Sequence, residues 1–310
     1  MRVLRSTDAA QPPVVIEEQV PQPRPQRGEL LVRVHAAGVT PTELVWFTTT
    51  HDNDGGQRRR AILGHEFSGV VAALGEAAVG FEIGQEVYGM NDWFADGALA
   101  EYCVTQPTSL AHKPSRVSHV EAAAVPIGAL TAWQGLFERA NLQAGEHVLV
   151  HGGAGAVGSF AIQLARFRGA RITATASARN VDFVTGLGAD KVIDYRAVRF
   201  EDEVADVDVV FDPVGGDTLQ RSWSVLRPGG RMVTVAADGE STTDERVKRA
   251  FFIVEPNQDQ LIRIGDLLES GTLHPVVDSV LPLSRAPAAF TGEVGRRGRG
   301  KIVVTIASET

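Results

Sequence analysis

Three glycines in HVLVHGGAGAVGSF, residues 147–160, have the types and the spacing to hold a phosphate group. Gly153, Gly155 and Gly158 give the pattern G-x-G-x-x-G between an apolar strand and a segment of helical periodicity. The first glycine permits a tight turn, the second lets backbone approach a pyrophosphate, and the third lets the helix pack closely on the sheet. The predicted dinucleotide site comprises Gly153, Ala154, Gly155, Ala156, Val157 and Gly158. A glycine-rich turn without a ligand is the alternative, but strand, helix and second strand have the spacing of a binding site.

The residues after the next predicted strand, 171–176, indicate which dinucleotide binds. A site for NAD usually places Asp or Glu about 20 residues beyond the glycines, where it binds the ribose 2′-hydroxyl. That window here reads TASARN, residues 175–180; it has no carboxylate, whereas Arg179 offers a guanidinium to a 2′-phosphate. Asp182 is expected in the first turn of the following helix. The window predicts NADPH as cofactor, with Ser177 and Arg179 at the site; for Arg179 the alternative is a solvated surface charge.

His65 and Glu66, in AILGHEFSGVV (61–71), form a second set that could do chemistry, because both side chains are metal ligands. The chain has one cysteine, Cys103, so an intrachain disulfide and a metal site built from several thiolates are both excluded. This cysteine usage fits a reducing compartment, and a cytoplasmic protein is expected. Cys103 lies in LAEYCVT, which alternates like a strand, and is expected to be a small buried apolar residue.

Length and composition limit the possible functions further. A chain of 310 residues is long enough for two domains, each with its own core. The formal net charge of −8 argues against nucleic acid or an anionic membrane as the main partner. No apolar run reaches the roughly 18 residues of a spanning helix, and the N-terminal residues resemble no signal peptide. These observations favour a globular protein that binds a small molecule.

The elements that must position the candidate residues change in character along the chain. The first third is β-rich, with strands expected at 14–20, 29–39, 67–75 and 99–105. The segment 118–140 is helical in pattern, and Ser118 and Glu121 have the spacing of a capping box. Strands and helices then alternate as far as residue 236, which predicts a parallel sheet covered on both faces. After residue 270 strand and loop patterns return.

The predicted fold class is therefore α/β, with a Rossmann doubly wound parallel sheet inserted into a β-rich domain. We assign residues 1–115 and 268–310 to the β-rich domain and residues 116–267 to the dinucleotide-binding domain. A polar segment without a pattern, residues 48–60, is predicted to be a mobile surface loop.

Ten segments, in their order and spacing, resemble the medium-chain dehydrogenase/reductase superfamily, and specifically its zinc-free quinone reductase branch of the zeta-crystallin type. They are AAGVTPTEL (36–44), GHEFSGVV (64–71), GQEVYGM (84–90), PIGALTAW (126–133), GGAGAVG (152–158), LGADKVIDY (187–195), VFDPVGG (210–216), LRPGGRMV (226–233), FFIVEPN (251–257) and RGKIVV (299–304). The resemblance covers nearly the whole chain. It implies that the split β-rich domain is GroES-like and that a cleft beside the Rossmann domain holds a nicotinamide.

The resemblance also implies roles for residues outside the glycine turn. Around the nicotinamide it places Thr131, Phe252 and Val254. Along the rest of the cofactor it places Tyr195, at the adenine-side ribose or phosphate, with Val214, Ala236 and Lys301. For the apolar members of this set, plain core packing is the alternative.

In zinc-dependent members of the superfamily, the histidine that aligns with His65 is one of three protein ligands, together with two cysteines or close equivalents. Thr40 and Ile127 stand at those cysteine positions, and neither supplies a thiolate. A catalytic zinc needs three strong protein ligands and an open fourth position, so no metal is expected. His65 and Glu66 are then expected to hydrogen-bond neighbouring backbone near the cleft. A direct role in polarising the substrate is the alternative.

Which reaction can proceed without a metal depends on where negative charge develops on the substrate. Oxidation of a simple alcohol needs a Lewis acid or a well-placed base. Hydride transfer to a quinone or an α,β-unsaturated carbonyl instead leaves a charge that the conjugated system delocalises. We therefore expect an NADPH-dependent quinone or enone oxidoreductase, in which Thr40 donates a hydrogen bond to the substrate and Trp46 offers a stacking face. For Trp46 a place in the core is an equal alternative. The run Arg58–Arg60 would favour acidic substrates, unless it is simply solvated.

Two other functions are open at this point. One is an alcohol dehydrogenase of the same superfamily with atypical zinc ligands, and the other is a non-catalytic protein that binds NADPH as a structural, sensor or scaffold component. A homodimer is expected in each case, because relatives pair the edges of their Rossmann sheets and an exposed edge strand is a template for such pairing.

Overall fold

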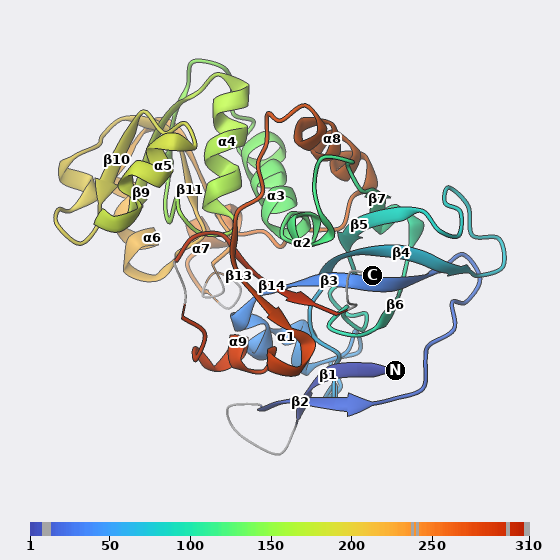
Figure 1. The fold of residues 1–310 in the computed structure, drawn as a ribbon. Helices are drawn as coiled ribbons and strands as arrows, with labels where there is room; N and C mark the ends of the chain where they lie inside the picture. The colour runs from blue at the N-terminus through green and yellow to red at the C-terminus, as the bar shows by residue number, and fades with distance from the viewer. Residues whose placement is uncertain (8–13, 237–238, 240–241, 296–297, 307–310) are drawn as a thin grey trace.

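A computed structural model describes residues 1–7, 14–236, 239, 242–295 and 298–306, which form two large sheets and a small one (Figure 1). A five-stranded parallel sheet has the order β10–β9–β8–β11–β12. Its strands are β8 (His147–Val150), β9 (Arg171–Ala176), β10 (Lys191–Asp194), β11 (Val207–Asp212) and β12 (Leu226–Thr234). All five fall within the predicted alternation of strands and helices, although β12 begins at Leu226, before the strand expected at 231–236.

Helices bury both faces of this parallel sheet, because its strands are apolar on both sides. Val148 and Val150 pack on one face, in one core with residues of α3, α4, α5 and α8, while Leu149 packs on the other with residues of α6 and α7. The helices are α3 (Pro126–Trp133), α4 (Gly158–Arg168), α5 (Val181–Gly186), α6 (Gly216–Ser222), α7 (Glu245–Ala250) and α8 (Gln258–Glu269). The doubly wound arrangement predicted from the alternating pattern is confirmed. Asp182 lies in the first turn of α5, as expected.

The second large sheet has seven strands drawn from both ends of the chain. Its order is β13–β14–β3–β4–β5–β7, and β6 pairs with β3. These strands are β3 (Leu30–Val39), β4 (Glu66–Leu74), β5 (Glu86–Met90), β6 (Tyr102–Thr105), β7 (Leu110–His112), β13 (Val277–Pro282) and β14 (Lys301–Thr305), with α9 (Ala288–Thr291) between the last two. β14 pairs antiparallel with β3, placing Ile302 opposite Val39. The C-terminal segment therefore joins the β-rich sheet, as its strand pattern indicates, whereas the boundaries at 115 and 267 remain predictions.

Three of the described strands escape the sequence analysis: β5, β7 and β1. β1 (Arg2–Thr7) pairs antiparallel with β2 (Val14–Gln19), and its Leu4 N–H donates to Leu99 O at 2.7 Å. The only apolar pair in β1, Val3 and Leu4, is adjacent rather than alternating, so the segment carries no period-2 signal.

The helical segment 118–140 is interrupted, in contrast to the single pattern read from the sequence. Ser118 and Glu121 form the predicted capping box at the start of α2 (His119–Ala123). A new helix, α3, begins at Pro126 and continues into a π-helical turn at Gln134–Arg139. The break has a simple cause, because Pro126 has no N–H to donate to the carbonyl four residues before it.

The segment 48–60, predicted as a loop without a pattern, has defined local structure. The helix α1 (Phe47–Thr50) leads into an isolated bridge between His51 and Gln57. Within that bridge Asp52 Oδ1 accepts from the N–H of Asp54 at 3.0 Å and of Gly56 at 2.7 Å. Side-chain hydrogen bonds of this kind form turns that hydrophobic periodicity does not reveal.

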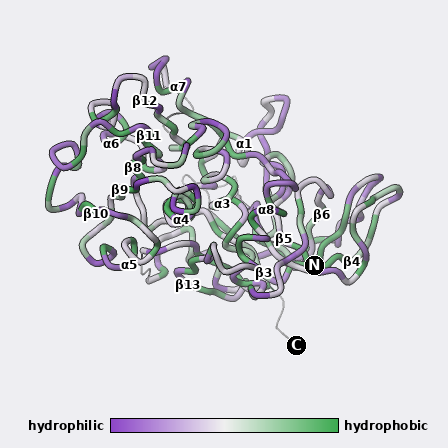
Figure 2. The backbone as a smooth tube through the Cα atoms, turned by 90° about the horizontal axis from the view of Figure 1, so that it is seen from above, coloured by the Kyte–Doolittle hydropathy of each residue, from purple (hydrophilic) through white to green (hydrophobic). Residues whose placement is uncertain are grey.

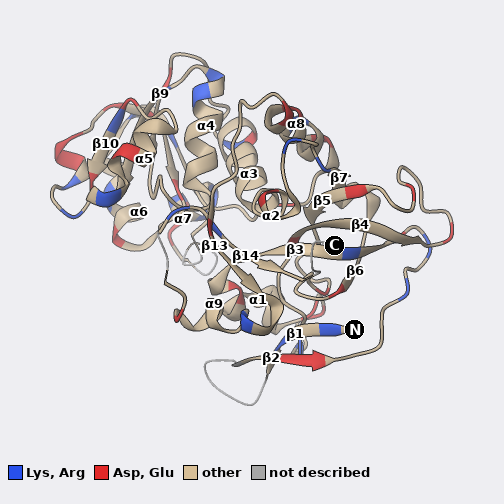
Figure 3. Cartoon of the chain, in the orientation of Figure 1, with Lys and Arg blue, Asp and Glu red and all other residues tan. Residues whose placement is uncertain are grey.

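Figure 2 shows hydrophobic stretches along the strands and the inner helices, with hydrophilic residues in the connecting loops. Acidic and basic residues are interspersed over the outer elements (Figure 3). Cys103 is buried, as expected. Within the described ranges, no helix has both the length and the apolar character to cross a bilayer.

Candidate active site

A cavity of about 410 Å³ lies where the carboxyl ends of β8, β11 and β12 face the β-rich sheet. Ligand sites at the carboxyl ends of parallel strands are typical of open α/β sheets. Many of the residues predicted to form the site line this one cavity: Thr40, Trp46, Thr131, Gly155, Ala156, Val157, Gly158, Val214, Phe252, Val254 and Lys301. Residues from both the Rossmann side and the β-rich side are thus brought to one place.

The glycine turn forms the floor of this cavity. A Cβ added at Gly158 would lie 2.3 Å from Gly152 O, so only glycine lets α4 start this close to the turn. The turn is tied to β9, since the N–H of Gly152 donates to Thr175 Oγ1 at 3.1 Å and that of Gly153 to Thr175 O at 2.9 Å. Gly155 is exposed. The turn therefore has the close packing and the open backbone that a pyrophosphate site needs.

A second cavity, of about 820 Å³, adjoins the first on the other side of the turn. Gly152 and Val214 line both cavities. The second is lined by the predicted Tyr195, by Arg196, Arg199 and Arg221, and by Asp217. Arg199 and Arg221 already pair with Glu201, and Arg221 also pairs with Asp217. Two adjoining spaces across a glycine turn, the first largely apolar and the second more polar, match the two ends of a dinucleotide.

Other predicted cofactor residues lie near the turn without lining either cavity. Gly153, Ala154, Ser177 and Ala236 are buried behind it. Arg179 is exposed on a short 3-10 turn, and its guanidinium lies against Gly298. No carboxylate among the described residues forms an ion pair with it. The guanidinium is therefore available to an anion at the end of β9.

Arg299, which the sequence analysis did not single out, fixes the backbone beside Arg179. Its Nε donates to Asn180 Oδ1 at 2.8 Å and its Nη2 to Arg179 O at 3.0 Å, while the guanidinium lies over the Phe183 ring. The C-terminal segment is held on the turn in the same region, because Gly300 N–H donates to Ala154 O at 2.8 Å.

The wall opposite the glycine turn contains a buried ion pair. Lys301 Nζ lies 2.5 Å from Glu66 Oε1, and the two side chains are only 5% and 0% exposed. The same ammonium donates to Thr40 Oγ1 at 3.1 Å, and the second oxygen of Glu66 accepts the Ile127 N–H at 3.0 Å. Thr131, one turn further along α3, donates its hydroxyl to Ile127 O at 2.6 Å, which leaves its oxygen free to accept.

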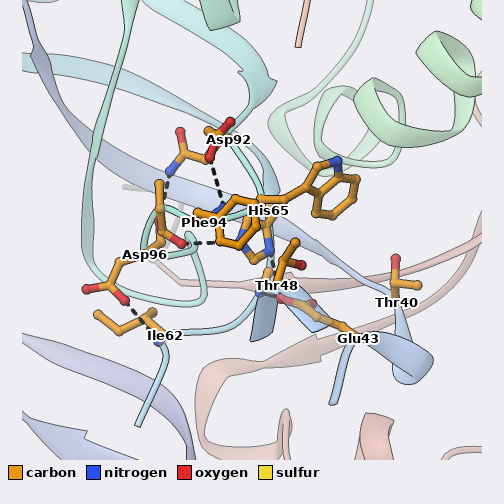
Figure 4. Close-up of polar contacts among 12 residues, drawn as sticks. Thr40, Glu43, Thr48, Ile62, His65, Asp92, Phe94 and Asp96 are labelled. Atoms are coloured by element: carbon orange, nitrogen blue, oxygen red, sulfur yellow. Dashed lines mark hydrogen bonds and ion pairs between the residues drawn. The ribbon is translucent and has the colours of Figure 1, made fainter. Parts of the chain in front are cut away.

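His65 is held by Glu43, a residue that the sequence analysis did not single out (Figure 4). Its Nδ1 lies 2.8 Å from Glu43 Oε1, and Glu43 also accepts the Gly64 N–H at 2.9 Å. Its Nε2 lies 3.3 Å from Ala95 O. His65 and Glu43 are 2% and 1% exposed, and neither lines the cavity. As expected, both residues contact backbone: His65 contacts Ala95 O, and Glu66 accepts the Ile127 N–H. The shortest contact of each is nevertheless to a side chain, Glu43 for His65 and Lys301 for Glu66.

Two tryptophans form the aromatic side of the cavity. Trp46 and Trp93 meet edge to face with ring centroids 5.1 Å apart, and both line the cavity. Trp93 Nε1–H donates to Val254 O at 2.7 Å, which links the β-rich side to the segment beside α8. Trp46 is half-buried and packs against the core, so both of its predicted roles apply in part.

The arginine run beside α1 is already committed to protein contacts. Arg58 donates to Ala95 O at 2.7 Å and to Thr48 O at 3.0 Å, and it pairs with Asp96. Arg60 pairs with Glu18 at 2.6 Å. Arg58 therefore holds the loop that carries Trp93, which is neither the substrate contact nor the solvated face considered from the sequence.

Comparisons with known proteins agree with this architecture. The model for the alcohol dehydrogenase GroES-like domain matches residues 26–115, and that for zinc-binding dehydrogenases matches residues 187–304. The chain is 33% identical over 303 residues to 2-methylene-furan-3-one reductase of Solanum lycopersicum, covering 93% of this chain and 74% of the relative. It is 31% identical over 310 residues to the chloroplastic NADPH-dependent alkenal/one oxidoreductase of Arabidopsis thaliana, covering 93% and 75%. A quinone oxidoreductase structure from Coxiella burnetii superposes with a TM-score of 0.87, at 29% identity over 99% of both chains.

The chain belongs to the medium-chain dehydrogenase/reductase superfamily. It is an oxidoreductase, and its relatives include enone and quinone oxidoreductases of this superfamily, as the resemblance implied. The GroES-like and Rossmann fold class is confirmed as well.

The residues at the zinc position of this superfamily do not fit a zinc ion. Thr40 is bonded to Lys301, Glu66 is paired with the same ammonium, and Ile127 has no donor atom in its side chain. Across the described ranges, no three His, Cys, Asp or Glu side chains gather as a metal site would require. The glycine turn, by contrast, fits a dinucleotide.

Proposed function

We propose that this protein is an NADPH-dependent reductase that transfers hydride to a quinone or an α,β-unsaturated carbonyl without a metal. The observation that carries the proposal is the wall facing the glycine turn. There the superfamily's zinc position is filled by Thr40 and the Glu66–Lys301 pair, beside an aromatic and aliphatic lining. The names of the similar reductases from tomato and Arabidopsis support the same class of reaction.

The lining residues have separate tasks in this proposal. Trp46, Trp93 and Ile127 give a flat conjugated substrate apolar surface on which to lie. Thr40 donates a hydrogen bond to its carbonyl oxygen, where negative charge accumulates as hydride arrives. Holding the two flat partners in register is then the largest contribution that the protein must make.

NADPH supplies the hydride when bound, and this chain's residues fit it at three places. The glycine turn receives the pyrophosphate, and Thr131, Phe252 and Val254 surround the position of the nicotinamide. Arg179 meets the 2′-phosphate, because it ends β9 without a carboxylate competing for it.

The decisive experiment is NADPH consumption followed at 340 nm with 9,10-phenanthrenequinone and with a simple enone, using protein freed of its tag. We expect turnover with at least one acceptor, unaffected by chelators. Chelator-sensitive oxidation of aliphatic alcohols would instead establish the zinc alcohol dehydrogenase. Tight NADPH binding with no oxidation by any acceptor would establish the non-catalytic binder.

We also propose that the protein is a homodimer formed through the outer edge of β12, the last strand of the parallel sheet, which pairs with no further strand among the described residues beyond the single bridge from Thr234 to Phe251. Light scattering of the purified protein measures its mass directly. A monomeric mass at micromolar concentration would overturn this assembly.

A further inference from the structure

Lys301 occupies an unusual position between a buried carboxylate and a hydroxyl that faces the cavity. Its Nζ is 2.5 Å from Glu66 Oε1 and 3.1 Å from Thr40 Oγ1. Lys301 and Thr40 both line the cavity, whereas Glu66 is fully buried behind them. The order of groups from the core to the cavity is therefore carboxylate, ammonium and hydroxyl.

The arrangement has a direction, because an ammonium can donate hydrogen bonds but cannot accept them. The hydrogen between Lys301 and Thr40 must belong to Lys301, so the hydroxyl hydrogen of Thr40 is directed elsewhere. Among the described residues no side chain or carbonyl accepts it. Since Thr40 lines the cavity, that hydrogen is presented to whatever oxygen binds there.

The carboxylate keeps the ammonium in place from behind. A Cβ added at Gly38 would lie 2.5 Å from Glu66 Oε1, so a glycine is required where β3 passes this carboxylate. The other oxygen of Glu66 accepts the Ile127 N–H at 3.0 Å, at the start of α3. The pair is thus fixed both to the β-rich sheet and to the helix that carries Thr131.

We propose that Lys301 and Thr40 form a proton relay to the substrate carbonyl oxygen. The proposal rests on the function proposed above and names its proton source. When bound, the cofactor would supply a hydride that forms a C–H bond at the β-carbon of an enone, and the electron pair of the C=C bond would shift so that negative charge collects on the carbonyl oxygen. The Thr40 O–H bond breaks as its proton goes to that oxygen, an N–H bond of Lys301 breaks to restore the hydroxyl, and solvent returns a proton to the amine. The product is the enol, which becomes the saturated ketone in solution; a quinone becomes the hydroquinone in the same way.

The relay predicts that the hydride step depends on the Thr40 hydroxyl. Single-turnover oxidation of saturating NADPH by the best acceptor is measured in the wild type, in Thr40→Val and in Thr40→Ser. General acid catalysis typically contributes about 10²–10⁴-fold, so Thr40→Val is expected to slow the step by roughly 10²-fold. Thr40→Ser, which keeps the hydroxyl, should stay within a few-fold of the wild type. A solvent isotope effect present in the wild type and in Thr40→Ser should fall toward unity in Thr40→Val.

The same measurements on Lys301 separate the relay from a simple cofactor contact. Lys301→Met is combined with Glu66→Gln, so that no charge is left stranded, and Lys301→Arg serves as the conservative variant. We expect the double variant to slow hydride transfer as much as Thr40→Val does. Adding Thr40→Val to the double variant should reduce the rate little further, because both changes interrupt the same proton path. Its NADPH dissociation constant, measured by fluorescence, should change by less than a few-fold.

Three outcomes would overturn parts of this account, and they can be told apart. If the Lys301 variants weaken NADPH binding but leave the saturated hydride step unchanged, Lys301 is a cofactor contact and the relay is wrong. If the losses from Thr40→Val and the Lys301 double variant add fully, the two residues act separately and the relay is again wrong. If none of the acceptors leads to oxidation of NADPH by the wild type, the proposed function fails and the relay fails with it.

Discussion

The two walls of the cavity differ in composition: one is formed largely by main-chain atoms and the other by side chains. At the glycine turn the surface is mainly backbone, because residues 152–158 are glycine and alanine apart from Val157. On the β-rich side it is side chains, held by the buried contacts Glu43–His65 and Glu66–Lys301. The first wall suits a ligand shared by many enzymes, whereas the second decides what reaction takes place beside it.

The second wall shows how one strand serves two purposes. His65 and Glu66 are neighbours at the start of β4, and successive side chains of a strand point to opposite faces. His65 accordingly meets Glu43 away from the cavity, and Glu66 meets Lys301 toward it. The histidine that binds metal in other members of the superfamily is here a structural group. The residue that faces the cavity is instead Lys301, the ion-pair partner of Glu66.

The largest expected effect comes from breaking these two contacts one at a time. Lys301→Met strands the Glu66 carboxylate and His65→Leu strands that of Glu43, and leaving a buried charge without its partner typically costs about 3–5 kcal/mol. Urea denaturation should show both losses in the free energy of unfolding. The comparison sharpens in single-turnover assays, where only Lys301→Met should slow hydride transfer. An equal slowing in His65→Leu would show that His65 polarises the substrate after all.

The backbone wall is tested by Gly158→Ala. Its Cβ would lie 2.3 Å from Gly152 O, so the start of α4 must move. Overpacking of this kind typically costs about 1–3 kcal/mol, and the shift should weaken NADPH binding by roughly 10²-fold because the phosphate donors lose their positions.

Gly186→Ala is the matched control for that substitution, since no atom lies within 4 Å of the added Cβ at the end of α5. It should leave NADPH binding unchanged and alter stability by less than about 1 kcal/mol. If both alanine variants bind NADPH like the wild type, the glycine turn does not hold the cofactor.

The difference between the walls also explains what the sequence could reveal. The glycine turn, the five parallel strands and the capping box at Ser118 are local patterns, each set by residues within a few positions of one another. Glu43 lies 22 positions from His65, and Lys301 lies 261 positions from Thr40. No periodicity connects residues so far apart, so their contacts come from the folded sheet alone.

Other structural features were missed because hydrophobic periodicity does not record them. The turn at Asp52 is made by side-chain hydrogen bonds, and Pro126 divides a segment whose hydrophobic pattern runs on without a break. Trp93 was missed because a tryptophan in a loop has no partner in the sequence. Its contact with Trp46 forms only when the β-rich domain folds, and its contact with Val254 only after the two domains meet.

A smaller effect is expected at Arg179, the residue proposed to bind the 2′-phosphate of NADPH. Arg179→Ala is expected to weaken NADPH binding by about tenfold or more, because hydrogen bonds to charged groups are typically worth about 1.5–3 kcal/mol, and to leave NADH binding nearly unchanged. Fluorescence titration of the two nucleotides measures the ratio. Preference of the wild type for NADH, with no effect of Arg179→Ala on NADPH, would show that the 2′-phosphate is not recognised here.

The smallest effect is a dependence of stability on pH, to which the half-buried His119 in α2 and the buried His151 after β8 both contribute. Burial, with the nearby His35 adding to it, lowers the pKa of His119 to about 4; burial and Arg221 lower that of His151 to about 3. An unfolded chain titrates its histidines near 6.5, so it binds more protons than the native state below that pH. The stability contributed by the neutral rings is complete above about pH 6.5 and is lost as the pH falls toward 4 and then 3. Urea midpoints from pH 7 to pH 4 should therefore fall, and His119→Gln and His151→Gln should each flatten this slope by a similar amount, because both rings stay largely neutral in the native state over this range. A slope as steep in both variants as in the wild type would mean that other groups control the acid sensitivity of the fold.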